Sequence, residues 1–176
     1  MEYLAINILS ENKVGIAEIL NNLAANSLCN IVDCKMTTLG EEISSNILIS
    51  GNWNEIAKLE SCLDTLQKDL NISILKQRTK APAYPDNLLP YNVYITSKDE
   101  PKILYEIVNF FKLEHVEITE LVAESRPAKK TGTPIMSLIM SINISVSENI
   151  ADLRERFIVF CDSFNLDGVM EAEKGL

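Results

Sequence analysis

The sequence YLAINILSENKVGIAEILNNLAANSLCNIVD, residues 3–33, decides the fold of this chain. In its first seven residues Leu4, Ile6 and Ile8 alternate with other residues, and this period of two predicts a half-buried strand over 3–9. A helix should follow, with Asn12 upstream as a plausible N-cap and the Asn26-Ser27 pair as a stop. The apolar residues that recur there at helical spacing are Ile16, Ile19, Leu20, Leu23 and Ala24.

The next segments complete a unit of alternating strands and helices. Residues 30–39 and 43–50 each carry an apolar run, and Gly40 marks a turn between them, so they predict a hairpin. Gly51-Asn52 interrupts the chain, and a second helix is expected over 53–68. Its apolar residues recur at helical spacing: Trp53, Ile56, Ala57, Leu59, Leu63 and Leu66. A short strand over 72–75 ends the unit, which has the order βαββαβ.

A proline-containing stretch separates this unit from a second one. Residues 78–90 include Pro82, Pro85 and Pro90 with little periodicity, which predicts an interdomain linker. Strand, helix and strand then recur at a constant offset of 87 residues. The matched positions are Leu4, Ile6, Ile8, Ile16, Leu20, Leu23 and Ile31 with Tyr91, Val93, Ile95, Ile103, Ile107, Phe110 and Ile118. The sequence therefore predicts one domain over 1–77 and another over 91–176.

The offset between the repeats grows toward the end of the chain. Ile56 and Leu63 match Leu153 and Phe160 at an offset of 97 residues. We expect the extra residues between the second and third strands of the second repeat, where the Pro-, Gly- and Lys-containing stretch 125–134 would lengthen the hairpin. Strand 135–145, helix 150–164 and strand 169–172 then complete the second repeat.

This order of elements predicts an α+β fold of two tandem ferredoxin-like domains. Right-handed crossovers place both helices of a βαββαβ unit on one face of a four-stranded antiparallel sheet. Each unit is small and buries little core by itself. Packing of one unit on another, and a homo-oligomer, are therefore expected ways to add buried area.

Composition and charge argue against several classes of function. Sixteen Lys and Arg against 25 Asp and Glu give a net charge of −9, which disfavours direct binding to nucleic acid or to anionic membranes. No apolar run approaches the length of a membrane span and no signal-peptide pattern is present, so a cytoplasmic protein is expected. The four cysteines form no CxxC pair, so neither a metal site nor another cofactor is expected.

Three blocks of sequence carry a resemblance to a known family. They are CNIVD at 29–33, LGEE at 39–42 and SGNWN at 50–54. With these blocks at this spacing, the chain resembles the glycine cleavage system transcriptional repressors, which are tandem ACT-domain proteins. The resemblance implies a non-catalytic regulator that represses glycine cleavage genes by binding a LysR-type activator protein, with glycine as effector. It also implies no direct contact with nucleic acid.

The resemblance further points to ligand-binding residues in the first repeat. ACT domains resemble D/N-x-P-G-[IVL] in the turn after the first strand, and that turn is here Asn12, Lys13, Val14, Gly15 and Ile16, without the proline. The family pattern adds an Asn at the start of the second strand, a position that Asn30 holds, followed by Ile31. The second repeat has an acid and a proline at Asp99 and Pro101, but Lys102 replaces the glycine and Glu117 replaces the asparagine.

Physical chemistry explains why such a turn suits an amino acid. Glycine lets the backbone approach a ligand closely, and the N–H groups at a helix start attract a carboxylate. The amide of Asn30 both donates and accepts, so it suits a zwitterion. The structural alternative is that the turn only shapes the chain, because Asn caps helices and Gly forms turns in many proteins without ligands.

Other functions have weaker support in the residues. An acylphosphatase shares the βαββαβ order, but its phosphate loop needs an arginine, and residues 10–15 contain none. An RNA-recognition fold needs aromatic residues on its central strands, and residues 43–50 contain none. Trp53 is expected in the core, and the single histidine, His115, at the surface. The remaining alternative is an ACT-type interaction or allosteric module that binds another amino acid or no ligand.

Overall fold

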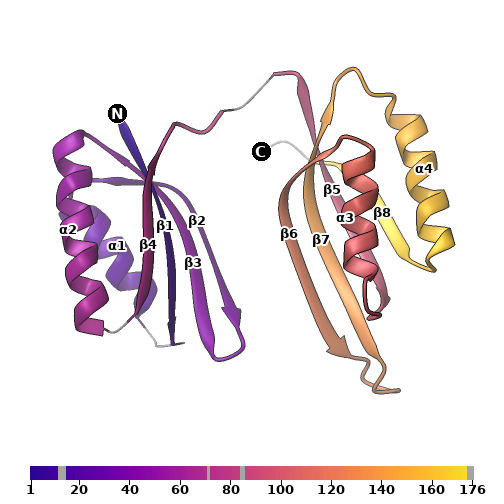
Figure 1. Cartoon of the computed structure of the whole chain (residues 1–176), viewed down its shortest axis with the longest axis horizontal. Helices are drawn as coiled ribbons and strands as arrows, with labels where there is room; N and C mark the ends of the chain where they lie inside the picture. The colour runs from indigo at the N-terminus through magenta and orange to yellow at the C-terminus, as the bar shows by residue number, and fades with distance from the viewer. Residues whose placement is uncertain (12–14, 71, 84–85, 174–176) are drawn as a thin grey trace. The chain divides into compact units, whose positions relative to one another are not determined.

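The computed structural model describes residues 1–11, 15–70, 72–83 and 86–173, which form two compact units (Figure 1). The division between them falls between Ala83 and Tyr84. Each unit is a four-stranded antiparallel sheet with two helices in the order βαββαβ. The predicted α+β fold is therefore confirmed.

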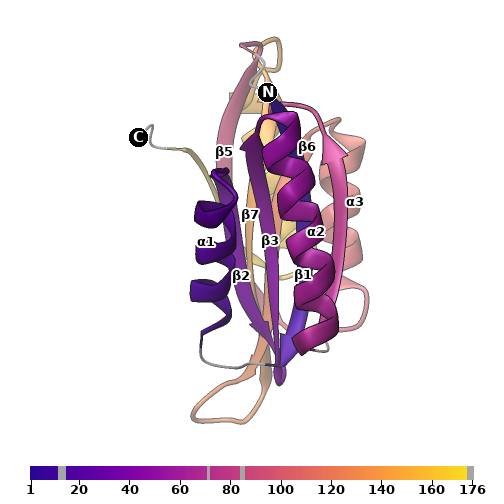
Figure 2. The ribbon, with the colours of Figure 1, turned by 90° about the vertical axis from the view of Figure 1, so that its left-hand side faces the viewer.

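The first unit contains strands β1 (Glu2–Glu11), β2 (Asn30–Leu39), β3 (Glu42–Gly51) and β4 (Ser73–Thr79) in the sheet order β2-β3-β1-β4. Helices α1 (Ile16–Asn26) and α2 (Trp53–Leu70) both lie on one face of this sheet (Figure 2). The strands alternate as expected, because Leu4, Ile6 and Ile8 point toward the helices and are at most 3% exposed. The opposite face of the sheet carries no helix of this unit.

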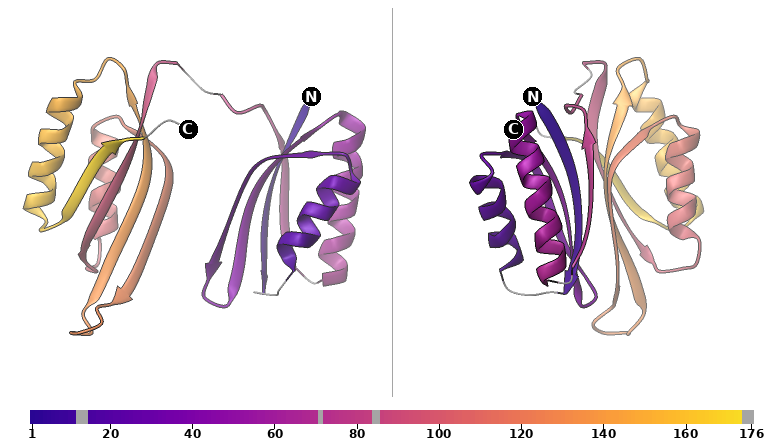
Figure 3. Two further views of the ribbon diagram at one scale, coloured as in Figure 1. Left: turned by 180° about the vertical axis from the view of Figure 1, so that it is seen from behind. Right: turned by 60° about the vertical axis from the view of Figure 1, so that its left-hand side comes forward.

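The second unit repeats this plan with strands β5 (Leu88–Lys98), β6 (Glu117–Pro127), β7 (Pro134–Ser145) and β8 (Asp167–Ala172) in the order β6-β7-β5-β8. Helices α3 (Ile103–Leu113) and α4 (Ile150–Ser163) cover one face (Figure 3). Aromatic rings fill the space between these helices. Phe111 and Phe157 are fully buried, and Phe110 stacks on Phe160 with ring centres 4.7 Å apart.

The strand registers show where the second repeat gained its extra residues. Asn30 pairs with Ser50 in the first unit, and Glu117 pairs with Asn143 in the second, so the offset rises from 87 to 93 residues across the hairpin. The helices α2 and α4 begin at Trp53 and Ile150, an offset of 97. Six extra residues therefore lie in the hairpin and four between β7 and α4. The expectation that the whole insertion lies in the hairpin was wrong.

The segments expected to be irregular are also shorter than their composition indicated. Residues 125–127 and Pro134 pair as strand, so only residues 128–133 connect β6 to β7. Likewise β4 extends to Thr79 and β5 begins at Leu88, and both strands reach into the predicted linker 78–90. Pro90 lies in β5, where its nitrogen needs no hydrogen, because proline is tolerated in a strand wherever no ladder hydrogen bond requires its N–H group.

Trp53 does not lie in the core, contrary to the expectation from helical spacing. Its side chain is 62% exposed at the start of α2, and the Arg78 guanidinium lies 5.5 Å from the ring centre. Arg78 in turn pairs with Glu60 at 2.8 Å. Helical spacing alone could not separate these outcomes, because the first turn of a helix projects beyond the sheet that it covers. His115 is exposed, as expected.

Candidate ligand site

The glycine of the predicted turn stands directly before α1. Gly15 has a left-handed backbone with φ 109°, and Ile16, the first helical residue, is buried. No side chain caps this helix start, so the N–H groups of its first turn face outward without an intrahelical partner. Asn12, Lys13 and Val14 lie outside the described residues. The described part of the turn thus has the backbone polarity that attracts a carboxylate.

The other two predicted residues lie at the opposite end of the same unit. Asn30 pairs with Ser50, which pairs with Tyr3 at the beginning of β1. Gly15 instead follows Glu11 at the end of β1. Eight residues of extended strand separate these two levels, which corresponds to roughly 26 Å. Within one unit, the structure therefore does not bring Asn30 and Ile31 together with the turn.

Strand β2, which carries Asn30 and Ile31, is an edge of its sheet. Its neighbour on one side is β3, and all ten of its residues are exposed. Apolar side chains are among them, with Ile31 37%, Val32 42% and Met36 39% exposed. An edge with exposed apolar residues and unpaired backbone groups is a template for pairing with another strand.

The second repeat shows what surrounds such a turn when all of it is described. Residues 99–104 line a cavity of about 330 Å³ together with 123–125 of β6 and Met136. Lys102 precedes α3 with a left-handed φ of 74°, as Gly15 precedes α1. Asp99, Glu100 and Glu124 also line this cavity, so its field opposes a ligand carboxylate. Glu117, the counterpart of Asn30, lies elsewhere and accepts a hydrogen bond from Asn143 at 3.3 Å.

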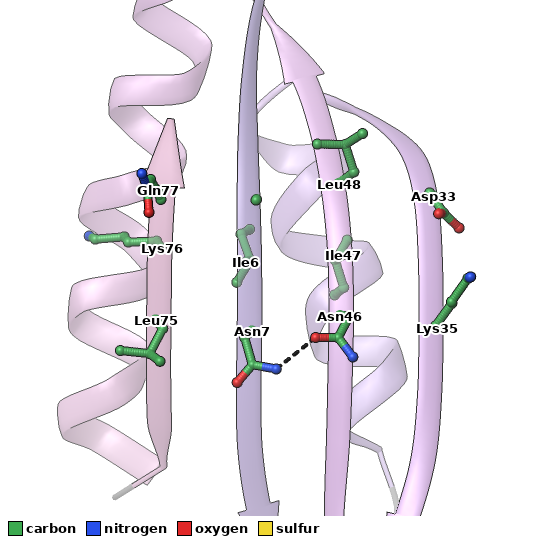
Figure 4. A pocket seen from close by; sticks show the side chains of 11 residues that line it. Ile6, Asn7, Asp33, Lys35, Asn46, Ile47, Leu48, Leu75, Lys76 and Gln77 are labelled. Carbon is green, nitrogen blue, oxygen red and sulfur yellow. Dashed lines mark hydrogen bonds between the residues drawn. The ribbon is translucent and has the colours of Figure 1, made fainter. Parts of the chain in front are cut away.

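Sequence reasoning did not find a shallow depression on the helix-free face of the first sheet (Figure 4). Its volume is about 550 Å³, and its centre is polar, because the Asn7 amide donates to Asn46 Oδ1 at 2.7 Å. Asp33 and Lys35 of β2 line one side and Gln77 of β4 lines the other. The signal in the sequence was the polar half of each alternating strand, which we had interpreted only as surface.

The cysteines and acids give no sign of metal or thiol chemistry in the described residues. No cluster of three or more His, Cys, Asp or Glu is placed to hold a metal ion there. Cys29, next to Asn30, is buried, and burial raises the pKa of its thiol, with nearby Glu55 acting in the same direction. A buried thiol with a raised pKa is a poor nucleophile. Among the described residues, no helix is long and apolar enough to cross a membrane.

Comparison with known proteins identifies the domain. The family model of the ACT domain matches residues 2–76, and the second unit repeats the same topology. The chain is a tandem ACT-domain protein. This tandem ACT protein is 28% identical to the glycine cleavage system transcriptional repressors of Escherichia coli strain K12 and Shigella flexneri. The alignment covers 94% of this chain and 87% of each repressor.

Two solved structures share the fold of this tandem ACT protein along its length. One is a candidate glycine cleavage system transcriptional repressor, with TM-score 0.75, 21% identity and coverage of 99% of this chain and 98% of the other. The other is a protein from Galdieria sulphuraria, with TM-score 0.76, 17% identity and coverage of 98% and 99%. Both support the arrangement of two βαββαβ units in one chain.

Proposed function

We propose that this protein is an amino-acid-sensing transcriptional regulator that represses glycine cleavage genes. The observation that carries the proposal is the 28% identity to the Escherichia coli repressor over 94% of the chain, both ACT units included. The family resemblance of residues 29–33, 39–42 and 50–54 points the same way. Glycine is the expected effector, since the turn at Gly15 offers a helix start to a carboxylate.

The effector site that we propose combines two edges. Asn30 and the turn lie at opposite ends of one unit, but antiparallel pairing of two β2 strands would put the Asn30 of one beside the turn of the other. The exposed apolar residues of β2 favour such pairing, and a second copy of the chain is the partner that supplies an identical edge. A homo-oligomer is thus part of the proposal.

Repression would act through a protein partner. The net charge of −9 opposes direct binding to DNA, so we propose that the partner is a transcription activator of the LysR type. Glycine binding would change the affinity for this activator by favouring one state of the protein. A regulatory role without catalysis fits the described residues, in which no nucleophile is paired with a base. The alternative is an ACT module that binds another amino acid or none, and the missing proline in the first turn favours it.

Two measurements test this function. Calorimetry of the purified protein against glycine, serine and alanine should give binding with glycine. In gel shifts with the glycine cleavage operator at physiological salt, the protein alone should leave the DNA unshifted and should alter the shift made by the activator. A specific shift by the protein alone contradicts the proposal. Binding of a different amino acid, with no effect on the activator complex, would favour the alternative.

A further inference from the structure

The second unit contains a cavity that differs from the one behind its β5–α3 turn. It lies between the end of β5, the start of α3 and the segment that joins α4 to β8, and its volume is about 330 Å³. This volume falls at the small end of the roughly 300–1,000 Å³ typical of ligand pockets. Six residues define its character: Ser97, Lys98, Glu100, Ile103, Phe164 and Asn165.

Opposite charges line this cavity without neutralising each other. Lys98 and Glu100 stand two residues apart at the end of β5, and neither makes an ion pair with any described residue. A cation alone would leave Lys98 without a counter-charge, and an anion alone would leave Glu100 without one. A zwitterion satisfies both, with its carboxylate at the ammonium group of Lys98 and its ammonium at the carboxylate of Glu100.

Two polar groups and an apolar wall complete the surroundings. Ser97 is 8% exposed, and its hydroxyl donates to the Lys98 carbonyl at 3.0 Å, which leaves its oxygen able to accept. The Asn165 side chain makes no hydrogen bond to the described residues. Asn165 has a left-handed φ of 53° in the turn after α4, and its N–H donates to Asp162. Ile103 and Phe164 form the apolar side.

We propose that this cavity binds an uncharged α-amino acid with an apolar side chain, such as valine or leucine. The site is separate from the glycine site proposed above and does not depend on it. Glycine would leave the apolar wall in contact with water, whereas each buried CH₂ group of a longer side chain raises affinity about fourfold. The second ACT unit would then report a different amino acid from the first.

Calorimetry on the full chain tests the charge requirement. L-valine and L-leucine should bind, and two analogues of valine that each lack one charge, isobutylamine and isovalerate, should bind at least about tenfold more weakly. Glycine should not compete with valine for this cavity. If isobutylamine or isovalerate binds as tightly as valine, or if valine and leucine do not bind at millimolar concentration, the proposal is overturned.

Three substitutions locate the binding. Lys98→Met and Glu100→Gln should each weaken valine binding by roughly tenfold to hundredfold, because each removes a charged partner. Asn165→Gly removes the amide but relieves the left-handed backbone, so it should raise Tm and still weaken valine binding. The control is Asp99→Asn, a charge loss in the same turn that lines only the other cavity. Unchanged valine affinity in Lys98→Met and Glu100→Gln would place the site elsewhere and refute the proposal.

Discussion

Gly15 and Lys102 occupy the same position in the two repeats, and both hold a left-handed backbone directly before a helix. Their φ angles are 109° and 74°. A Cβ atom added to Gly15 would meet nothing within 4 Å, so space does not require glycine at that position. The turn demands the backbone angle, and only glycine adopts it without cost.

Lys102→Gly should therefore stabilise the second unit. A non-glycine residue in the left-handed region costs roughly 1–2 kcal/mol, and the greater freedom of glycine in the unfolded chain takes back part of that gain. We expect a net increase of about 1 kcal/mol in the free energy of unfolding, measured by urea denaturation. Lys112→Gly, the same change inside α3, should lower stability by about 1 kcal/mol. Equal effects of the two substitutions would contradict this account of the turn.

The effector site of the first repeat can be tested through Asn30. Asn30→Ala removes an exposed amide at the start of β2 and should weaken glycine binding by roughly tenfold to hundredfold, with little change in fold. Glu117→Ala, the equivalent change in the second repeat, should have a smaller effect. Calorimetry with glycine measures both affinities. The opposite result, with loss in Glu117→Ala alone, would show that the second repeat holds the site.

Gly15→Val tests the same site from the turn. Valine is β-branched and poorly suited to a φ of 109°, so the variant should bind glycine more weakly and should also be less stable. Gly15→Ala separates these effects, since it strains the same backbone with less bulk near the ligand. Calorimetry and thermal unfolding of both variants give the comparison. If both variants bind glycine as the native protein does, the turn is only structural.

Ser45 gives a prediction about core stability. It is fully buried in β3, and its hydroxyl has no hydrogen-bond partner, whereas the equivalent residue of the second unit is Leu138. Ser45→Ala should raise the free energy of unfolding by about 1 kcal/mol, because it removes an unsatisfied buried group. Ser44→Ala, on the neighbouring half-buried residue, should change it little. Loss of stability in Ser45→Ala would indicate that the hydroxyl has a partner in solution, such as an internal water.

Cys161 makes the second unit sensitive to alkaline pH. Burial, with help from Asp162 and Asp167, raises the pKa of this thiol to about 11 from 9.0. Between these two values the unfolded chain loses a proton that the folded chain keeps, so stability falls as pH rises from about 9 to about 11. Urea denaturation at the two ends of this range should show the loss. The loss should be smaller in Cys161→Ala, and an equal loss there would assign it to other groups.

The sequence by itself determined the elements and their repetition. Leu4, Ile6 and Ile8 alternate because one face of β1 is buried, and the same alternation returns 87 residues later because the second unit solves the same packing problem. Periodicity is a local property, so local sequence was sufficient to find it. The matching turns before α1 and α3 were visible for the same reason.

Only the tertiary structure decided which of these residues lie together. Asn30 and Gly15 are 15 positions apart in the chain, yet the helix between them returns the chain to the far end of the sheet. Trp53 has helical spacing but lies outside the core, and the ten extra residues of the second repeat are divided between two connections. These outcomes depend on where each strand pairs and where each helix ends over the sheet. Such long-range contacts leave no periodic trace in the local sequence.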